Sequence, residues 1–276
     1  MNVLLPNTVS EACEMMSSHR APVPVAGGTD LFVHWPQRGS QWDGSLLDLS
    51  GLSELKPYSW TREVLKLGAL TTYWDLIQDP LISAEFPLLH SAARQVGAVQ
   101  IQTRGTWAGN IMNASPAADG VAVLLAYDAR LLLRSIRGTE EIPLSEFYTG
   151  YKTMRRQPDQ LLTEIHIPRA RMEFQLFEKV GSRAAQAITK VGLAITRSEN
   201  SWRVVTNSVA PTVCRCPTLE SFLGGGSIAQ GPEDLLEPVR LDISPIDDLR
   251  SSAQYRETVL TRLLYFGLKD ECFSFA

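Results

Sequence analysis

The sequence predicts an α+β protein with two domains, and three observations support this prediction. Strand-like and helix-like apolar segments both occur along the chain, without an internal repeat. The 276 residues are long for one compact core and suit one large or two modest domains. The pattern changes after Pro168 and a charged stretch, so we expect a boundary near 169–174, with domains at 1–172 and 173–276.

The first domain is expected to mix short strands with short helices. Thr8 and Ser10 are N-cap candidates for its first helix. Hydrophobic spacing predicts strands at 2–5, 23–26, 46–49, 65–67, 130–133 and 161–167, helices at 10–18, 71–77, 90–96 and 117–127, a helix start at 31–35, and a loop at 103–113.

The second domain is expected to begin with strands and to end with helices. Residues 174–179 alternate in polarity, 187–196 mix β-branched and small residues, and 202–209 are strand-like. A helix at 218–222 is expected to stop at the glycines 224–226. The longest predicted helix is 252–266, because one of its faces carries the apolar side chains of Tyr255, Val259, Leu263 and Phe266.

Composition argues against several classes of protein. A net charge of −4 and a pI near 5.7 offer no positive field for nucleic acid. The cysteines lack the spacing of disulfide scaffolds, metal sites and iron–sulfur sites, so we expect no bound metal and reduced thiols at Cys13, Cys214, Cys216 and Cys272. The N-terminus lacks a signal peptide's basic segment, and no apolar run approaches the ~20 residues that span a bilayer. We therefore expect a soluble cytoplasmic protein without a membrane span.

A first glycine-rich segment follows the strand predicted at 23–26. Gly27 and Gly28 lie between this strand and the helix start at 31–35, where backbone N–H groups can hold a phosphate. Thr29 adds a hydroxyl, and Asp30 is better suited to capping the loop than to facing an anion. The segment lacks the G-x-G-x-x-G spacing of a Rossmann fold, and by itself it is equally typical of a tight turn.

A second segment, 103–119, is dense in small and short polar residues. Thr106, Asn110, Asn113 and Ser115 supply donors and acceptors that need partners when they are packed. A ligand with many polar edges, such as a phosphate-ribityl chain, would satisfy them. A self-contained loop of turns would also do so.

Together the two segments resemble a known family. Residues 26–31 read A-G-G-T-D-L, and residues 104–119 read R-G-T-W-A-G-N-I-M-N-A-S-P-A-A-D. Both are similar to the flavin-binding motifs of the FAD-binding subunits in the xanthine dehydrogenase and carbon monoxide dehydrogenase family. The likeness runs along the chain, through further motifs at 147–153, 161–165, 179–188 and 242–256.

The resemblance implies a fold and a cofactor. The expected fold is an FAD-binding domain of the vanillyl-alcohol-oxidase (PCMH) type, followed by a smaller α/β C-terminal domain. The first domain would consist of two α/β subdomains, at about 1–55 and 56–172, with FAD between them. No His or Cys in either segment is placed to form a flavin bond, so we expect FAD to be bound without a covalent link.

The resemblance also implies roles for individual residues, none of them catalytic. The pyrophosphate is expected to meet backbone N–H groups of Val25, Ala26, Gly27, Gly28, Thr29, Asp30 and Leu31. The facing wall is expected to consist of Thr106, Ala108, Gly109 and Asn110. The flavin and ribityl end is expected to lie near Asn113, Ser115, Asp119, Leu162 and Lys179.

The family's chemistry implies partner subunits. A molybdenum cofactor on a large subunit would oxidise the organic substrate, and [2Fe-2S] clusters on a small subunit would relay the electrons. The flavin of this chain would receive them and pass them to NAD or another acceptor. We expect a heterotrimer or its dimer.

Two alternatives stay open at this point. A stand-alone flavin oxidoreductase would carry an acid or base beside the flavin, but His19, His34, His90 and His166 all lie outside the two segments. A structural or assembly protein that has lost the flavin is the other alternative. It is favoured by Trp107 and Ala108, which replace the family's small aliphatic residue and glycine.

Overall fold

The computed structural model describes residues 2–18, 20, 22–33, 44–199 and 201–272. The N-terminal part opens with a small parallel sheet of order β1-β3-β2, formed by Asn2–Leu4, Ser45–Asp48 and Val23–Val25. Helix α1 (Val9–Met16) begins at Thr8, whose side chain accepts a hydrogen bond from the N–H of Glu11. It packs against β6 (Arg130–Ser135) through a buried face of helical spacing: Val9, Ala12, Cys13 and Met16.

A five-stranded antiparallel sheet forms the centre of the N-terminal part. Its order is β4-β5-β10-β6-β7, comprising Tyr58–Trp60, Val64–Gly68, Leu161–Pro168, Arg130–Ser135 and Gly138–Pro143. In β10 the alternating side chains of Leu161, Ile165 and Ile167 are buried in the main core.

Short helices fill the space between this sheet and the C-terminal part. They are α3 (Tyr73–Ile77), α4 (Pro80–Glu85), α5 (Pro87–Gln95), α6 (Val99–Gln102), α7 (Trp107–Asn113) and α8 (Asp119–Ala126). Every residue of α8 is buried, because the helix lies between the core of the N-terminal part and the C-terminal sheet. The remaining small elements are the 3-10 turns Leu31–Val33, Ser53–Leu55 and Leu144–Glu146, and the hairpin of β8 (Tyr148–Gly150) and β9 (Thr153–Met154).

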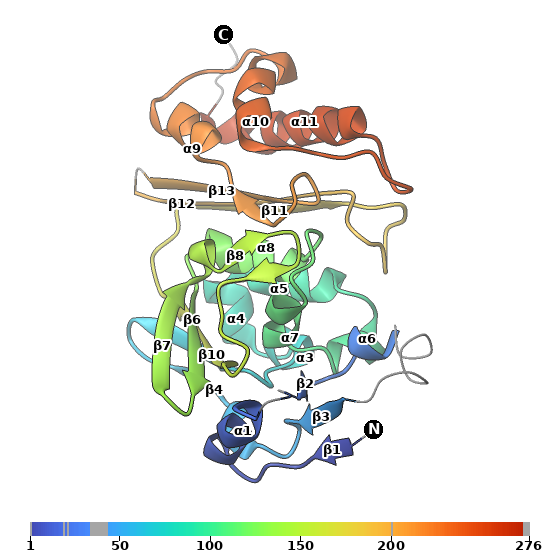
Figure 1. Ribbon diagram of the computed structural model, residues 1–276. Coiled ribbons are helices and arrows are strands. Elements are labelled where there is room, and N and C mark those ends of the chain that lie inside the picture. The colour runs from blue at the N-terminus through green and yellow to red at the C-terminus, as the bar shows by residue number, and fades with distance from the viewer. Residues whose placement is uncertain (1, 19, 21, 34–43, 200, 273–276) are drawn as a thin grey trace.

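The C-terminal part is a four-stranded antiparallel sheet covered on both faces. Its strands are β11 (Phe174–Val180), β12 (Val191–Ser198), β13 (Ser201–Asn207) and β14 (Cys214–Arg215). One face packs against α5 and α8 of the N-terminal part. The other is covered by α9 (Pro217–Gly224), α10 (Leu236–Asp242) and α11 (Ala253–Cys272), with the 3-10 turn Pro232–Leu235 (Figure 1).

Strand β12 shows why this sheet belongs to two cores. Val191, Leu193 and Ile195 enter the C-terminal core, whereas Ala194 joins the N-terminal one. The positions on the second face, Gly192, Ala194 and Thr196, are small, which allows α8 to lie close. The Thr196 hydroxyl donates to the carbonyl of Ala126 at the end of α8.

The predicted α+β class is confirmed, and the predicted strands and helices at most positions are found. The loop predicted at 103–113 is wrong in part, because residues 107–113 form α7. The segment's glycine and asparagines suggested a loop, but Thr106 caps the helix and Trp107, Ala108 and Ile111 bury one face of it. The helix start predicted at 31–35 is a 3-10 turn at 31–33, and 34–35 lie outside the described residues.

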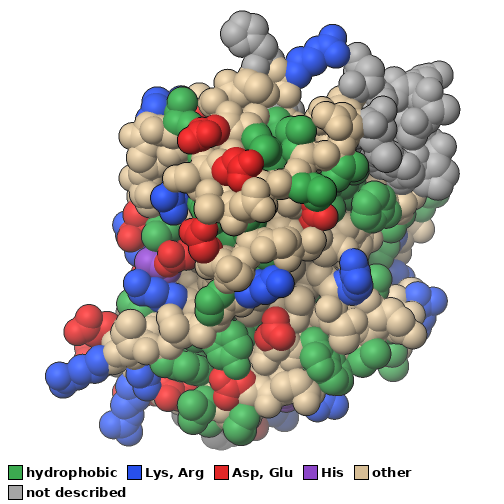
Figure 2. Space-filling view, turned by 90° about the horizontal axis from the view of Figure 1, so that it is seen from below, with side chains coloured by type: hydrophobic (Ala, Val, Ile, Leu, Met, Phe, Trp, Pro, Cys, Tyr) green, Lys and Arg blue, Asp and Glu red, His purple; other side chains and the backbone are tan. Residues whose placement is uncertain are grey.

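Within the described segments, no helix combines the length and apolar character required to traverse a bilayer. The face seen in Figure 2 carries acidic, basic and apolar side chains close to one another.

The prediction from this packing concerns Gly192. A Cβ at this position would overlap the Oδ1 of Asn207, its partner across β12 and β13. We expect Gly192→Ala to lower the free energy of unfolding by about 2 kcal/mol, because overpacking displaces Asn207 from its buried contacts. Urea unfolding measures this, with Gly51→Ala as the control, since nothing lies within 4 Å of a Cβ there. Equal stability of the two variants would contradict the packing described.

Candidate functional site

The first glycine segment, 26–30, leaves the end of β2 and lies directly on the second segment. A Cβ at Gly27 would overlap the carbonyl oxygen of Arg104, so only glycine allows the two backbones to approach this closely. Gly28 has φ +70°, and a Cβ there would lie 2.5 Å from the ring of Phe32. Thr29 also lies next to the second segment, because a Cβ built on Gly105 would be 3.3 Å from the Oγ1 of Thr29. The structure therefore joins two segments that are about 75 residues apart in the sequence.

The second segment is ordered by hydrogen bonds within the helix start. Thr106 is the N-cap of α7, and its Oγ1 accepts from the N–H of Gly109 at 3.0 Å. The Thr106 hydroxyl is thus already used for capping. Trp107 is fully buried and its ring contacts that of Tyr73 at a tilt of 53°, with centroids 4.8 Å apart, while Ala108 is 5% exposed. The side chains of Trp107 and Ala108, the two residues that differ from the family pattern, therefore point into the core.

The two segments are also joined at the far end of α7. The Nδ2 of Asn113 donates to the Oδ1 of Asp30 at 3.1 Å. The Nζ of Lys152 donates to the Oδ1 of the same Asn113 at 3.4 Å. Asp30 therefore holds the first segment against α7.

Lys152 is a residue that the sequence analysis did not include among the site residues. It lies in the tight turn between β8 and β9 with φ +54° and brings a positive charge to the junction of the two segments. A signal for it was present in the sequence, because the motif at 147–153 was part of the family resemblance.

The turn after α7 is held by its own backbone and Ser115. Ala114 ends the helix in the left-handed conformation, at φ 50° and ψ 40°, a conformation that costs alanine about 1 kcal/mol. The Oγ of Ser115 accepts from the N–H of Ala117 at 3.2 Å. A strained alanine of this kind is typical of functional turns.

Asp119 and Lys179 form a buried ion pair at the start of α8. Their side chains are 6% and 7% exposed, and the Nζ of Lys179 lies 2.7 Å from Oδ2 of Asp119. Oδ1 of Asp119 accepts from the Thr189 hydroxyl at 2.6 Å and from Nδ2 of Asn207 at 3.0 Å. Lys179 also donates to the carbonyl of Gln95 at 2.9 Å. The pair joins the N-terminal part to three segments of the C-terminal part.

Two predicted site residues, Leu162 and Lys179, make no hydrogen bond to the first glycine segment, 26–30. Leu162 is 5% exposed within β10, which packs against α7, and it belongs to the main core. The Lys179 ammonium is held by Asp119 and Gln95. Of the histidines, His166 pairs with Glu164 within β10 and His90 lies on α5, whereas His19 and His34 fall outside the described residues.

Comparisons with known proteins identify the family. Residues 1–170 match the family described as the FAD binding domain in molybdopterin dehydrogenase, and residues 177–270 match the CO dehydrogenase flavoprotein C-terminal domain. The xanthine dehydrogenase FAD-binding subunit of Escherichia coli O157:H7 is 28% identical over 90% of this chain and 88% of that protein.

Two further relatives extend the likeness. The carbon monoxide dehydrogenase medium chain of Hydrogenophaga pseudoflava is 25% identical over 94% of this chain and 92% of that protein. A structure of carbon monoxide dehydrogenase from the same organism superimposes with a TM-score of 0.86 over 96% of this chain and 94% of the other, at 24% identity. The chain therefore belongs to the family of FAD-binding subunits of molybdenum hydroxylases, and it is an oxidoreductase subunit of the xanthine dehydrogenase type.

Proposed function

We propose that this chain binds FAD at the junction of segments 25–31 and 106–119 and passes electrons from iron–sulfur clusters to a separate acceptor. The supporting observation is the contact of Gly27 with the Arg104 carbonyl, which places two glycine-bearing backbones side by side. Such a surface lets the backbone approach a pyrophosphate closely.

The residues present fit FAD. The bulky Trp107 and the methyl of Ala108 are turned into the core, so neither fills the junction. The carboxylate of Asp30 is engaged by Asn113, and Lys152 adds a cation nearby. The Lys152 ammonium is a source of attraction for a phosphate-bearing ligand, and the hydrogen bond from Asn113 holds the Asp30 carboxylate against α7.

Within this proposal the chain's residues bind and orient the cofactor. Residues 25–31 and 106–110 would hold the pyrophosphate from two sides, and Asn113 and Ser115 would line the path towards the flavin. Asp119, Lys179 and Leu162 would form the wall behind it. Bound FAD stores two electrons and exchanges them singly, which suits a junction between one-electron clusters and a two-electron acceptor.

The source of the electrons is expected on other subunits. Among the described residues, no group of three or more His, Cys, Asp or Glu side chains is arranged to hold a metal ion. We propose an iron–sulfur small subunit and a molybdenum-binding large subunit as partners. The relatives that are named as a medium chain or an FAD-binding subunit support this arrangement. The free thiols of Cys13, Cys214 and Cys216 suit a reducing compartment such as the cytoplasm.

A cationic cavity next to the Asp119 network supports NAD as the acceptor. The cavity, of about 350 Å³, lies between the 182–190 loop and residues 249–250. It is lined by three cations, Arg183, Lys190 and Arg250, and none of the eight described residues that line it is acidic.

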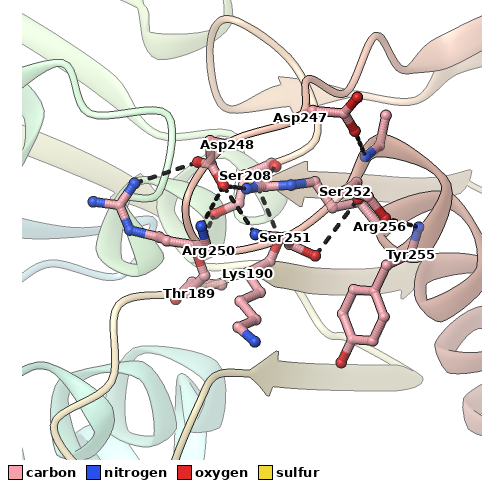
Figure 3. Close-up of polar contacts among 11 residues, drawn as sticks. Thr189, Lys190, Ser208, Asp247, Asp248, Arg250, Ser251, Ser252, Tyr255 and Arg256 are labelled. Carbon is pink, nitrogen blue, oxygen red and sulfur yellow. Dashed lines mark hydrogen bonds and ion pairs between the residues drawn. The ribbon is translucent and has the colours of Figure 1, made fainter.

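Asp248 offsets part of this charge, because its carboxylate lies 3.4 Å from the Arg250 guanidinium and 2.7 Å from that of Arg256 (Figure 3). Within the described residues, no carboxylate forms an ion pair with Arg183 or Lys190, and the nearby Asp247 accepts from the N–H of Ala253. The Lys190 ammonium lies 5.7 Å from the ring centre of Tyr255. A cavity with this surplus of positive charge suits the phosphates of a dinucleotide.

Substitution of Gly28 tests cofactor binding. We expect the wild-type chain to retain FAD that acid precipitation releases, and Gly28→Val to lose FAD at least tenfold more readily. The reason is that a side chain there meets Phe32 and strains a backbone at φ +70°. Gly226→Val is the matched control, because Gly226 has φ +69° in open space. Flavin absorbance after gel filtration measures retention, and full occupancy in Gly28→Val would argue against the proposed site.

Substitutions in the cationic cavity test the acceptor. In the FAD-loaded chain, we expect Arg183→Gln and Lys190→Gln each to raise the Kd of NADH about tenfold, because each removes one charged phosphate contact. NADH fluorescence measures the Kd, and Arg62→Gln, an exposed arginine outside the cavity, is the control. An unchanged Kd in both variants would point to a different acceptor or a different cavity.

A further inference from the structure

Arg256 lies behind the cationic cavity, in the first turn of α11, and its side chain is buried. Its Nη1 donates to the carbonyl of Lys190 at 3.1 Å and to the carbonyl of Ser208, and its Nη2 donates to Oδ1 of Asp248 at 2.7 Å (Figure 3). One guanidinium therefore joins the loop that precedes β12, the end of β13 and the turn that precedes α11.

Two of these three segments form the walls of the cavity. On one wall, the backbone of the cavity residue Lys190 is held directly by the guanidinium. On the other wall, Oδ1 of Asp248 accepts from the guanidinium and also from the N–H groups of Arg250 and Ser251, at 2.8 and 3.0 Å. Arg250 lines the cavity, so its backbone is placed by a carboxylate that Arg256 holds.

The start of α11 also contacts the side chain of Lys190. The ring of Tyr255, the neighbour of Arg256 in the sequence, has its centre 5.7 Å from the Lys190 ammonium. The N–H of Tyr255 donates to Oγ of Ser252 at 3.2 Å, which fixes the start of the helix. Consecutive residues of α11 therefore contact the backbone and the ammonium of one cavity cation.

The carboxylate of Asp248 is ionised at neutral pH. Burial would raise the pKa of this carboxyl, but the N–H of Arg250 and the guanidinium of Arg256 outweigh burial and hold the pKa below its usual range. Asp248 and Arg256 thus form a charged pair, in which either partner alone would leave the other without compensation.

We propose that Arg256 is a positioning residue for the acceptor site, because it holds Lys190 and Arg250 where both cations can meet the phosphates of one dinucleotide. Arg256 does not itself line the cavity. Two cations that are already in place bind a ligand more tightly, since the ligand does not have to order the two walls. This inference rests on the function proposed for the cavity.

Arg256→Lys separates the position of the cations from the charge behind them. Lysine keeps the positive charge, but it lacks the planar fork that reaches two carbonyls and a carboxylate. In the FAD-loaded chain, we expect this variant to raise the Kd of NADH about tenfold, because the ligand must then order both walls. NADH fluorescence measures the Kd. A guanidinium that contributed only its charge would leave the Kd unchanged.

Asp248→Asn tests the same proposal with the opposite electrostatic sign. Loss of this negative charge makes the cavity more positive, so electrostatics alone predicts a lower Kd of NADH. The proposal predicts a several-fold higher Kd, because a neutral amide holds Arg256 and the N–H of Arg250 less strongly than a carboxylate does. This variant decides the question if Arg256→Lys does not fold.

Arg215→Lys is the matched control. Arg215 pairs with Glu220 in the same part of the chain, with Nε and Oε1 2.9 Å apart, and it does not line the cavity. We expect this variant to lower the unfolding temperature and to leave the Kd of NADH unchanged. The comparison separates the placement of the cavity cations from a general loss of stability.

Three results would overturn the proposal: an unchanged Kd of NADH in Arg256→Lys, an unchanged or lower Kd in Asp248→Asn, or a loss of affinity in Arg215→Lys as large as that in Arg256→Lys. A wild-type chain that does not bind NADH, or that binds it with an affinity unaffected by both Arg183→Gln and Lys190→Gln, would instead reject the function proposed for the cavity. The two failures are therefore distinguishable.

Discussion

The structure depends on one buried carboxylate, that of Asp119. At the start of helix α8 it meets Lys179 of β11, Thr189 of the 181–190 loop and Asn207 of β13. A buried charge is tolerated only when its partners are complete, and removal of one partner from such a pair costs about 3–5 kcal/mol. Asp119 therefore links the two parts of the chain at a point that, in the proposed function, would form the wall of the flavin site.

This arrangement explains why small residues matter at some distance from the cofactor junction. Asn207 can reach Asp119 only because Gly192 leaves room for it on β12. Gly27 likewise allows the carbonyl of Arg104 to approach the first segment, and a Cβ at Gly120 would crowd the side chain of Asn110. The proposed site therefore depends on backbone segments that lie close to one another, and polar side chains such as those of Asp30 and Asn113 hold these segments together.

The sequence predicted the fold class and most elements, because their apolar periodicity is strong. It failed at α7, where local composition favours a loop and tertiary burial of Trp107 and Ile111 decides in favour of a helix. The grouping of Gly27 with Arg104, and of Asp30 with Asn113, lies beyond any local pattern. The individual cofactor contacts of residues 25–31 and 106–119 stay a prediction.

The central claim is that this chain works as the flavin subunit of a larger molybdenum enzyme. Purification of the native complex through a tag on this chain, followed by flavin, iron and molybdenum analysis, tests it most directly. The account predicts two further chains, acid-releasable FAD in a one-to-one ratio with this chain, and both metals. A native assembly that contained only this chain and oxidised a donor by itself would contradict the account.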